Sequence, residues 1–377
     1  MRRSLTILTA TAVFTITAIL PPHVFAQSSA RESSKSPSAD PSVWHFGVSG
    51  DSRNCGDVVM PAIAGGVWKK EARFYWLLGD FRAIYDFDQD MQHEPEHIAK
   101  PMTVSGYLQA AWPDFIQNQL QPFGTMPVFL GIGNHDTIPP MTREAWLLQF
   151  ADWLDTPALR RQRLSDDRNS HRLTTYYHWV EGNVDFITLD NATEDQFDAA
   201  QMTWFEKVLA ADRSIPQIQT IVVGMHEALP DSISAGHSMN QSIVGTESGR
   251  RAYADLLKMQ NENHKHVYVI ASHSHYFMDG IFNTEYWRTH GGLLPGWIVG
   301  TAGAVRYGLP ANAGDAHAAE TNVYGFLLGT VKPSGEIHFE FQRLGESDVP
   351  EPVTQRFTPE FVHWCFAKNS QALEEKK

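Results

Sequence analysis

The sequence lacks a basic segment: its 30 lysines and arginines are outnumbered by 43 aspartates and glutamates. The resulting net charge is −13 at pH 7. Proteins that bind nucleic acids or other large polyanions generally present a clustered basic face. The composition therefore argues against a nucleic-acid-binding surface. The sequence also shows no internal repeat and no long low-complexity segment.

A hydrophobic run long enough to span a membrane, about 20 apolar residues, is also missing. The N-terminal apolar stretch, 5–20, follows two arginines and ends at Pro21 and Pro22. Val24 and Ala26 then complete a pattern typical of a signal peptide that is cleaved after residue 26. We therefore expect residues 1–26 to direct export to the periplasm or the extracellular space, leaving no membrane span.

Cysteine is nearly absent. No cysteine lies near the expected cleavage site, which argues against a lipid anchor, and the chain contains only Cys55 and Cys365. In an exported protein an even number of cysteines suggests a disulfide. The alternative is that Cys55, which follows Asp51 by four positions, is a buried thiol or a neighbour of a functional site.

The rest of the chain divides by composition. Residues 27–41 are rich in serine, alanine, proline and charge, which predicts a disordered tether. Residues 42–345 are long and apolar enough for one large domain, and no linker marks a second one. Residues 346–377 are then a C-terminal extension.

Strand-like and helix-like patterns alternate in the first half, as is typical of an α/β fold. The second half contains a hairpin signal at Glu181-Gly182-Asn183. The acidic insertion 80–101 is expected to be a loop that shapes a ligand mouth. Two β-rich halves with helices outside predict a layered sandwich, with strands at 43–49, 73–78, 126–130, 174–180, 184–189, 219–224, 266–271, 297–299, 324–332 and 336–342, and helices at 56–70, 104–121, around 204–209 and at 250–261.

Polar side chains that bind metals or transfer protons follow several of these apolar runs, in Gly50-Asp51, Gly79-Asp80, Gly133-Asn134-His135-Asp136, Met225-His226 and His273-Ser274-His275. In an α/β fold such positions meet at one edge of a sheet. Carboxylate, amide and imidazole ligands suit Mn, Fe, Zn or Co. A pair of metal ions needs ligands that converge from several strand ends, and the candidates are Asp51, Asp80, Asn134, His226, His273 and His275.

The ordered series of motifs resembles the calcineurin-like metallophosphoesterase family over about residues 43–342. The resemblance implies a four-layer α/β/β/α sandwich of two mixed sheets with helices outside. It also implies two divalent or trivalent metal ions and the hydrolysis of phosphomonoesters or phosphodiesters. A small phosphorylated molecule is therefore the expected substrate.

The resemblance also implies roles for individual residues. His135 would stand near the leaving-group oxygen, and Asp136 would orient its imidazole. Asp80 would bridge the two metals. The first metal would be bound by Asp51, Asp80 and His275, and the second by Asp80, Asn134, His226 and His273.

One motif departs from the family pattern. The family usually has Asp-x-His where this chain has Asp51-Ser52-Arg53, so one ligand of the first metal is missing. Arg53 joins His135 and Asp136 as a candidate catalytic residue, because a guanidinium binds phosphate oxygens through paired hydrogen bonds. Purple acid phosphatases, a branch of the superfamily, also lack this histidine and use a tyrosine three positions after the second aspartate. Here that position is Ala83, and the remaining candidates for the missing ligand are Tyr85, Asn54, Cys55, a water or none.

Two other interpretations stay open. The missing ligand could empty the first metal site and leave a non-catalytic, phosphoesterase-like binding protein. Alternatively, Gly50-Asp51-Ser52 resembles the nucleophile motif of GDSL-type serine esterases, with Ser52 as nucleophile and Asp315-Ala-His317 as an approximate acid and base. That interpretation leaves the Asn134-His135 and His273/His275 pairs unexplained. Among the other histidines, His237 lies in a polar loop after His226 that could face a substrate.

Overall fold

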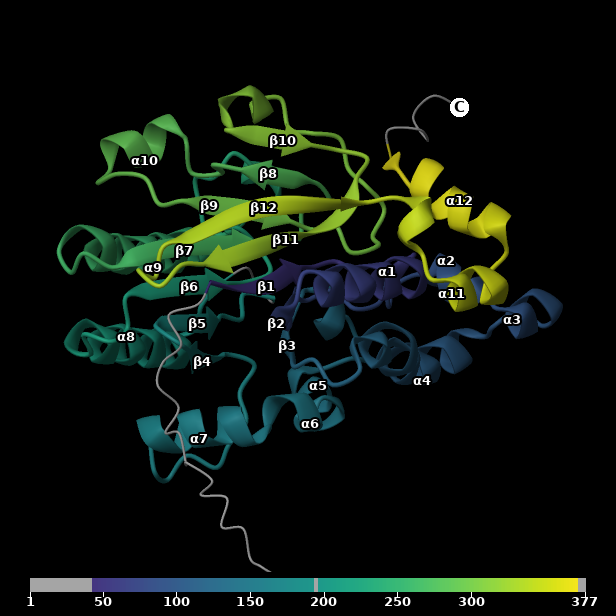
Figure 1. Cartoon of the computed structure of the whole chain (residues 1–377), viewed down its shortest axis with the longest axis horizontal. Helices are drawn as coiled ribbons and strands as arrows, with labels where there is room; N and C mark the ends of the chain where they lie inside the picture. Colours follow the sequence, from purple (N-terminus) through teal and green to yellow (C-terminus); the bar gives the residue numbers. More distant parts are fainter. Residues whose placement is uncertain (1–42, 193–195, 372–377) are drawn as a thin grey trace, which may run out of the picture. The chain divides into compact units, whose positions relative to one another are not determined.

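Figure 1 shows the computed structural model, which describes residues 43–192 and 196–371. The expected signal peptide and tether lie outside these residues. Across the described residues, no helix combines the length and apolar character needed to cross a bilayer.

The first sheet has five strands in the order β12-β11-β1-β2-β3. The neighbours β1, β2 and β3 are parallel, whereas β11 runs antiparallel beside β1 and β12 pairs antiparallel with β11. The strands that bear the first three motifs are therefore adjacent. Their bounds are β1 Trp44–Ser49, β2 Ala72–Leu78, β3 Val128–Gly131, β11 Tyr324–Val331 and β12 Ile337–Leu344.

The second sheet has seven strands in the order β10-β8-β9-β7-β6-β5-β4. Its centre, β5, β6, β7 and β9, is parallel, and the edges are antiparallel. The expected hairpin is confirmed as the β4–β5 pair. The bounds are β4 Tyr177–Glu181, β5 Val184–Thr188, β6 Thr220–Gly224, β7 His266–Ala271, β8 Phe277–Asp279, β9 Gly296–Val299 and β10 Ala318–Glu320.

An aromatic core joins the inner faces of the two sheets. Phe46 and Phe74 of the first sheet contact Phe186 of the second at ring-centroid distances of 4.9 and 5.0 Å. Trp179 stacks on Phe129 at 3.8 Å. These contacts bury large apolar surfaces and hold the sheets face to face.

Helices cover the outer face of each sheet, which confirms the expected α/β/β/α sandwich. On the first sheet these are α1 Gly56–Lys69, α4 Val104–Phe115, α5 Arg143–Gln149, α6 Ala151–Leu154, α11 Glu351–Arg356 and α12 Pro359–Ala367. On the second they are α8 Ala199–Ser214, α9 Ile243–Asn261 and α10 Glu285–Thr289. Helix α7, Pro157–Asp166, packs beside β4.

Several expectations from the sequence were wrong in detail. The helix expected at 104–121 ends at Phe115 and continues as a wider π-helical turn, Ile116–Leu120, just after Pro113, which lacks a helical N–H donor. Helix α9 begins seven residues before position 250, because the Ser242 side chain accepts the Gly245 N–H and caps it.

The acidic insertion is not an open loop. It contains α2 Gln89–Gln92 and α3 Pro95–Ala99, and both Asp88 and Asp90 are fully buried. Asp90 accepts hydrogen bonds from Arg82 and from the Asp57 N–H. These two acids therefore stabilise the protein interior, whereas Tyr85, 67% exposed, and Ile98, 64% exposed, reach toward solvent.

Candidate metal centre

The structure brings all six candidate ligands to one edge of the sandwich. Asp51, Asp80 and Asn134 follow the carboxyl ends of β1, β2 and β3, and His226 and His273 follow β6 and β7. Hydrogen bonds between the sheets close this edge: the Gly50 N–H donates to the Val299 carbonyl, and His226 Nδ1 donates to the Leu78 carbonyl at 2.9 Å.

Close backbone packing explains the glycine in two of the motifs. A Cβ on Gly79 would lie 2.3 Å from the Gly133 nitrogen, and a Cβ on Gly133 would lie 2.4 Å from the Asp80 nitrogen. Larger residues would therefore push the two loops apart. The ligand positions also adopt unusual backbone, with φ of +63° at Asp51, +59° at Asp80 and +62° at His273. Such left-handed residues are costly and concentrate at functional sites.

Hydrogen-bond acceptors converge around His226 Nε2. This atom lies 2.9 Å from Asn134 Oδ1, 3.0 Å from His273 Nδ1 and 3.4 Å from Asp80 Oδ1. Because His226 Nδ1 donates to the Leu78 carbonyl, Nε2 carries either a proton or a free lone pair. Burial alone would lower the pKa of His226, but Asp80 and Asp51 outweigh it and raise the pKa, so a proton on Nε2 can donate to these acceptors. A metal cation would replace that proton and could be bound by all four groups.

The electrostatics of this cluster favour a positive charge. Burial alone would raise the pKa values of Asp51 and Asp80, but nearby imidazoles, chiefly His275 for Asp51 and His226 for Asp80, outweigh it and lower both. Both carboxylates are therefore anionic at neutral pH. Burial and His226 hold the pKa of His273 well below its usual range, so His273 is neutral, the form that binds metals. Asp80, Asn134, His226 and His273 thus fit a divalent cation.

In the other half of the expected dinuclear site, the Arg53 guanidinium lies among the residues expected to bind the first metal ion. His275 donates from Nδ1 to the Val305 carbonyl at 2.6 Å, so its Nε2 lone pair points back toward Asp51 Oδ1, 3.2 Å away. Arg53 Nη2 donates to this same Nε2 at 3.2 Å, and Arg53 Nε lies 3.6 Å from Asp80 Oδ2. A guanidinium donates and cannot ligate a metal, so this half does not fit the first metal ion.

The structure changes the role expected for Asp136. Its carboxylate accepts the backbone N–H groups of Asp80, Phe81 and Gly133 and makes no hydrogen bond to the His135 ring. The imidazole is instead oriented by the Ala83 carbonyl, 2.6 Å from Nδ1. Asp136 therefore positions the Asp80 loop, and the expectation that it orients His135 was wrong. His135 Nε2 faces the centre, 3.8 Å from Asp80 Oδ2.

Aromatic and acidic residues outside the motifs surround the ligands; the sequence had suggested Tyr85 and His237, but not Tyr307 or Glu227. Tyr307 stacks on His275 with ring centroids 3.9 Å apart, and His237 lies 5.2 Å from His273. Tyr85 lies against His135 at 4.9 Å, and its hydroxyl accepts from Arg53 Nη1 at 3.4 Å. Glu227 Oε1 lies 3.6 Å from His273 Nε2; its place directly after His226 was the available signal.

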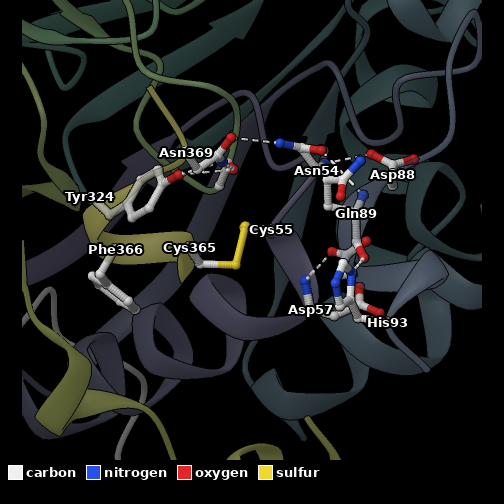
Figure 2. Close-up of a disulfide and its surroundings, with 12 residues drawn as sticks. Asn54, Cys55, Asp57, Asp88, Gln89, His93, Tyr324, Cys365, Phe366 and Asn369 are labelled. Carbon is white, nitrogen blue, oxygen red and sulfur yellow. Dashed lines mark hydrogen bonds between the residues drawn. A yellow bond between two sulfur atoms is a disulfide. The ribbon is translucent and has the colours of Figure 1, made fainter. Parts of the chain in front are cut away.

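Figure 2 shows how the loop after Asp51 is fixed. Cys55 forms a disulfide with Cys365 of α12, which resolves the alternatives left by the sequence. The Asn54 side chain donates to Asn369 at 2.7 Å, and the Asn54 N–H donates to Asp88 at 2.5 Å. The C-terminal segment and the acidic insertion therefore clamp this loop from two sides.

The serine-esterase interpretation finds no support in this geometry. Ser52 Oγ is buried and has no hydrogen-bond partner among residues 43–192 and 196–371, whereas a serine nucleophile needs a base within reach. His317 instead lies 3.7 Å from Asp279, and its side chain is 66% exposed.

No protein-family model matches the sequence, and no curated protein does. Among solved structures, a purple acid phosphatase from yellow lupin (Lupinus luteus) seeds is 14% identical, with a TM-score of 0.46, over 80% of this chain and 53% of its own. The structure of PhoD is 13% identical, with a TM-score of 0.45, over 89% of this chain and 78% of its own. This chain thus spans about half the length of the lupin enzyme. The function of the chain is therefore inferred from its own side chains.

Proposed function

We propose that the protein is a metal-dependent hydrolase of phosphomonoesters or phosphodiesters. The observation that carries this proposal is the convergence of three acceptor groups, from Asn134, His273 and Asp80, on His226 Nε2, with the other His226 nitrogen turned away toward the Leu78 carbonyl. The residues that would bind the cation are Asp80, Asn134, His226 and His273. A bound cation supplies Lewis-acid polarisation of a phosphoryl oxygen and lowers the pKa of water.

The chain's own residues would complete the reaction. Arg53 is charged, nearly buried and beside the ligands, so its N–H groups can hold phosphoryl oxygens. His135 is anchored through Nδ1 and presents Nε2 to the centre, where it would bond to the leaving-group oxygen. Tyr85 and His237 stand beside these groups and would contact the rest of the substrate. As expected from the sequence, we further propose that the protein acts after export.

Metal removal and reconstitution test this proposal. We expect exhaustive chelation to abolish hydrolysis of a nitrophenyl phosphate monoester or diester, and Mn²⁺ or Zn²⁺ to restore it. His273→Ala should lose both bound metal and activity, whereas His290→Ala, an exposed histidine after α10, should keep both. Activity that survives chelation would contradict the proposal. Bound metal without turnover of any phosphate ester would favour the non-catalytic alternative.

Substitution of His135 tests the leaving-group role separately. Because Nδ1 donates to the Ala83 carbonyl and burial lowers the pKa of His135, the residue acts as a general acid only in its doubly protonated form, which gives the Nε2 proton to the leaving-group oxygen. Such an acid contributes about 10² to 10⁴ in rate. His135→Ala should lower kcat by about that factor while the bound metal is retained, because the side chain is not among the proposed ligands. Loss of the metal instead would show that His135 holds the centre together.

A further inference from the structure

The Arg53 guanidinium lies among the residues expected to bind the first metal. Its Nη2 donates to His275 Nε2 at 3.2 Å, and its Nε lies 3.6 Å from Asp80 Oδ2. Asp51 Oδ1, 3.2 Å from His275 Nε2, completes this group. Each of these three acceptors was an expected ligand of the first metal, and the group already contains one fixed positive charge.

This charge is permanent. An arginine guanidinium is not deprotonated in proteins, so Arg53 keeps its positive charge at any working pH. It has no lone pair to offer a metal. A divalent cation placed beside Asp51 and His275 would therefore meet a like charge and would have to displace a donor from its acceptor.

The position of Arg53 is also constrained. The residue is only 7% exposed, and Nη1 donates to Tyr85. The next residues, Asn54 and Cys55, are held by Asp88, Asn369 and the disulfide to Cys365 (Figure 2). The backbone around Arg53 is therefore fixed, and the buried side chain is held by its contacts with Tyr85 and His275.

We propose that the centre binds a single metal ion, at Asp80, Asn134, His226 and His273, and that Arg53 takes the place of the other metal. This inference rests on the proposed function and deepens it. Asp80 keeps its bridging position, since Oδ1 faces His226 and Oδ2 faces Arg53. The phosphate ester would then lie between one metal ion and one guanidinium.

Metal counting by mass spectrometry tests this inference without an activity assay. Protein saturated with Mn²⁺ or Zn²⁺ and then desalted should hold one metal per chain. Arg53→His restores an imidazole in the Asp-x-His pattern and should hold two. Arg288→His, the same change at an exposed position on α10, should still hold one. With Mn²⁺, paramagnetic resonance should show an isolated ion in the native protein and a coupled pair in Arg53→His.

A second pair of variants decides the question if Arg53→His does not fold. His275→Ala should keep the single metal, and His273→Ala should lose it. Two metals in the native protein, or loss of the metal in His275→Ala, would overturn the single-metal inference and leave the proposed function standing. No bound metal in the native protein would overturn both. An Arg53→His variant that folds and still binds one metal would refute the role given to Arg53.

Discussion

Arg82 offers the sharpest test of what holds the centre in place. Its guanidinium is fully buried and pairs with Asp57 at 2.5 Å and with Asp90 at 2.9 Å, and it also contacts Asp114. These acids belong to α1, α2 and α4, and Arg82 follows Asp80 by two positions. One side chain therefore ties three helices to the loop that carries the bridging ligand.

Replacement of Arg82 by methionine, which has a similar length, would leave Asp90 without its cation. Of the cations in the described part of the chain, Asp57 and Asp114 would keep only the partly exposed Arg356, at 3.4 and 4.0 Å. Breaking a buried ion pair in this way typically costs about 3–5 kcal/mol. We expect the free energy of unfolding in urea to fall by about that amount at pH 8. Arg160→Met removes an exposed arginine that pairs with Asp155, and it should leave the free energy unchanged.

The pH dependence separates lost charge from lost packing. Burial raises the pKa of Asp114 to about 7 and that of Asp90 well above its usual range, while Arg82 lowers both. Without Arg82 these pKa values rise further, so the folded variant takes up protons more readily and gains stability as the pH falls. The difference in free energy of unfolding between the native protein and Arg82→Met should therefore shrink as the pH falls from 8 to 5.5. A difference below about 1 kcal/mol at pH 8, or one independent of pH, would refute this explanation.

Two further predictions concern stability. Burial alone would lower the pKa of His178, but Asp185 and Asp166 outweigh it and raise the pKa to about 10. The protonated imidazole therefore stabilises the folded state fully below the unfolded pKa of about 6.5, and this stabilisation is lost as the pH rises toward 10. The native protein should exceed His178→Gln in free energy of unfolding by on the order of 4 kcal/mol below pH 6.5, and the difference should shrink as the pH rises. A difference independent of pH would contradict this prediction. The disulfide joins residues 310 positions apart. Its reduction, or Cys365→Ala, should lower the free energy of unfolding in urea by about 5 kcal/mol. An unchanged free energy would show that the bond does not constrain the unfolded chain.

The sequence predicted the strand ends well because they are local features. Each motif lies where an apolar run stops, and the carboxyl ends of parallel strands meet at one edge. The five polar segments that the structure brings together are those that the motifs marked. One edge of the second sheet was missed, since its strands β8 and β10 have three residues each and show little periodicity.

The roles of individual side chains were harder to predict, because they depend on contacts distant in sequence. The adjacency of His135 and Asp136 suggested a pair, yet the 3₁₀ turn His135–Thr137 separates them and directs Asp136 to backbone N–H groups. Likewise, the partner of Arg53 is His275, far away along the chain. The sequence places Arg53 at the position of the missing ligand, but only the fold shows that its guanidinium contacts His275 and lies beside Asp80.

The bond between Cys55 and Cys365 also has a consequence for the order in which the protein matures. Synthesis begins at the N-terminus, so Cys55 leaves the ribosome 310 residues before its partner. Disulfide formation then requires an oxidising compartment or an added oxidant. The loop with Asp51 and Arg53 thus receives its covalent clamp only when nearly the whole chain has been made. A chain expressed in a reducing cytosol, or cleaved ahead of α12, would have the ligands but lack the disulfide that fixes the backbone two residues after Arg53.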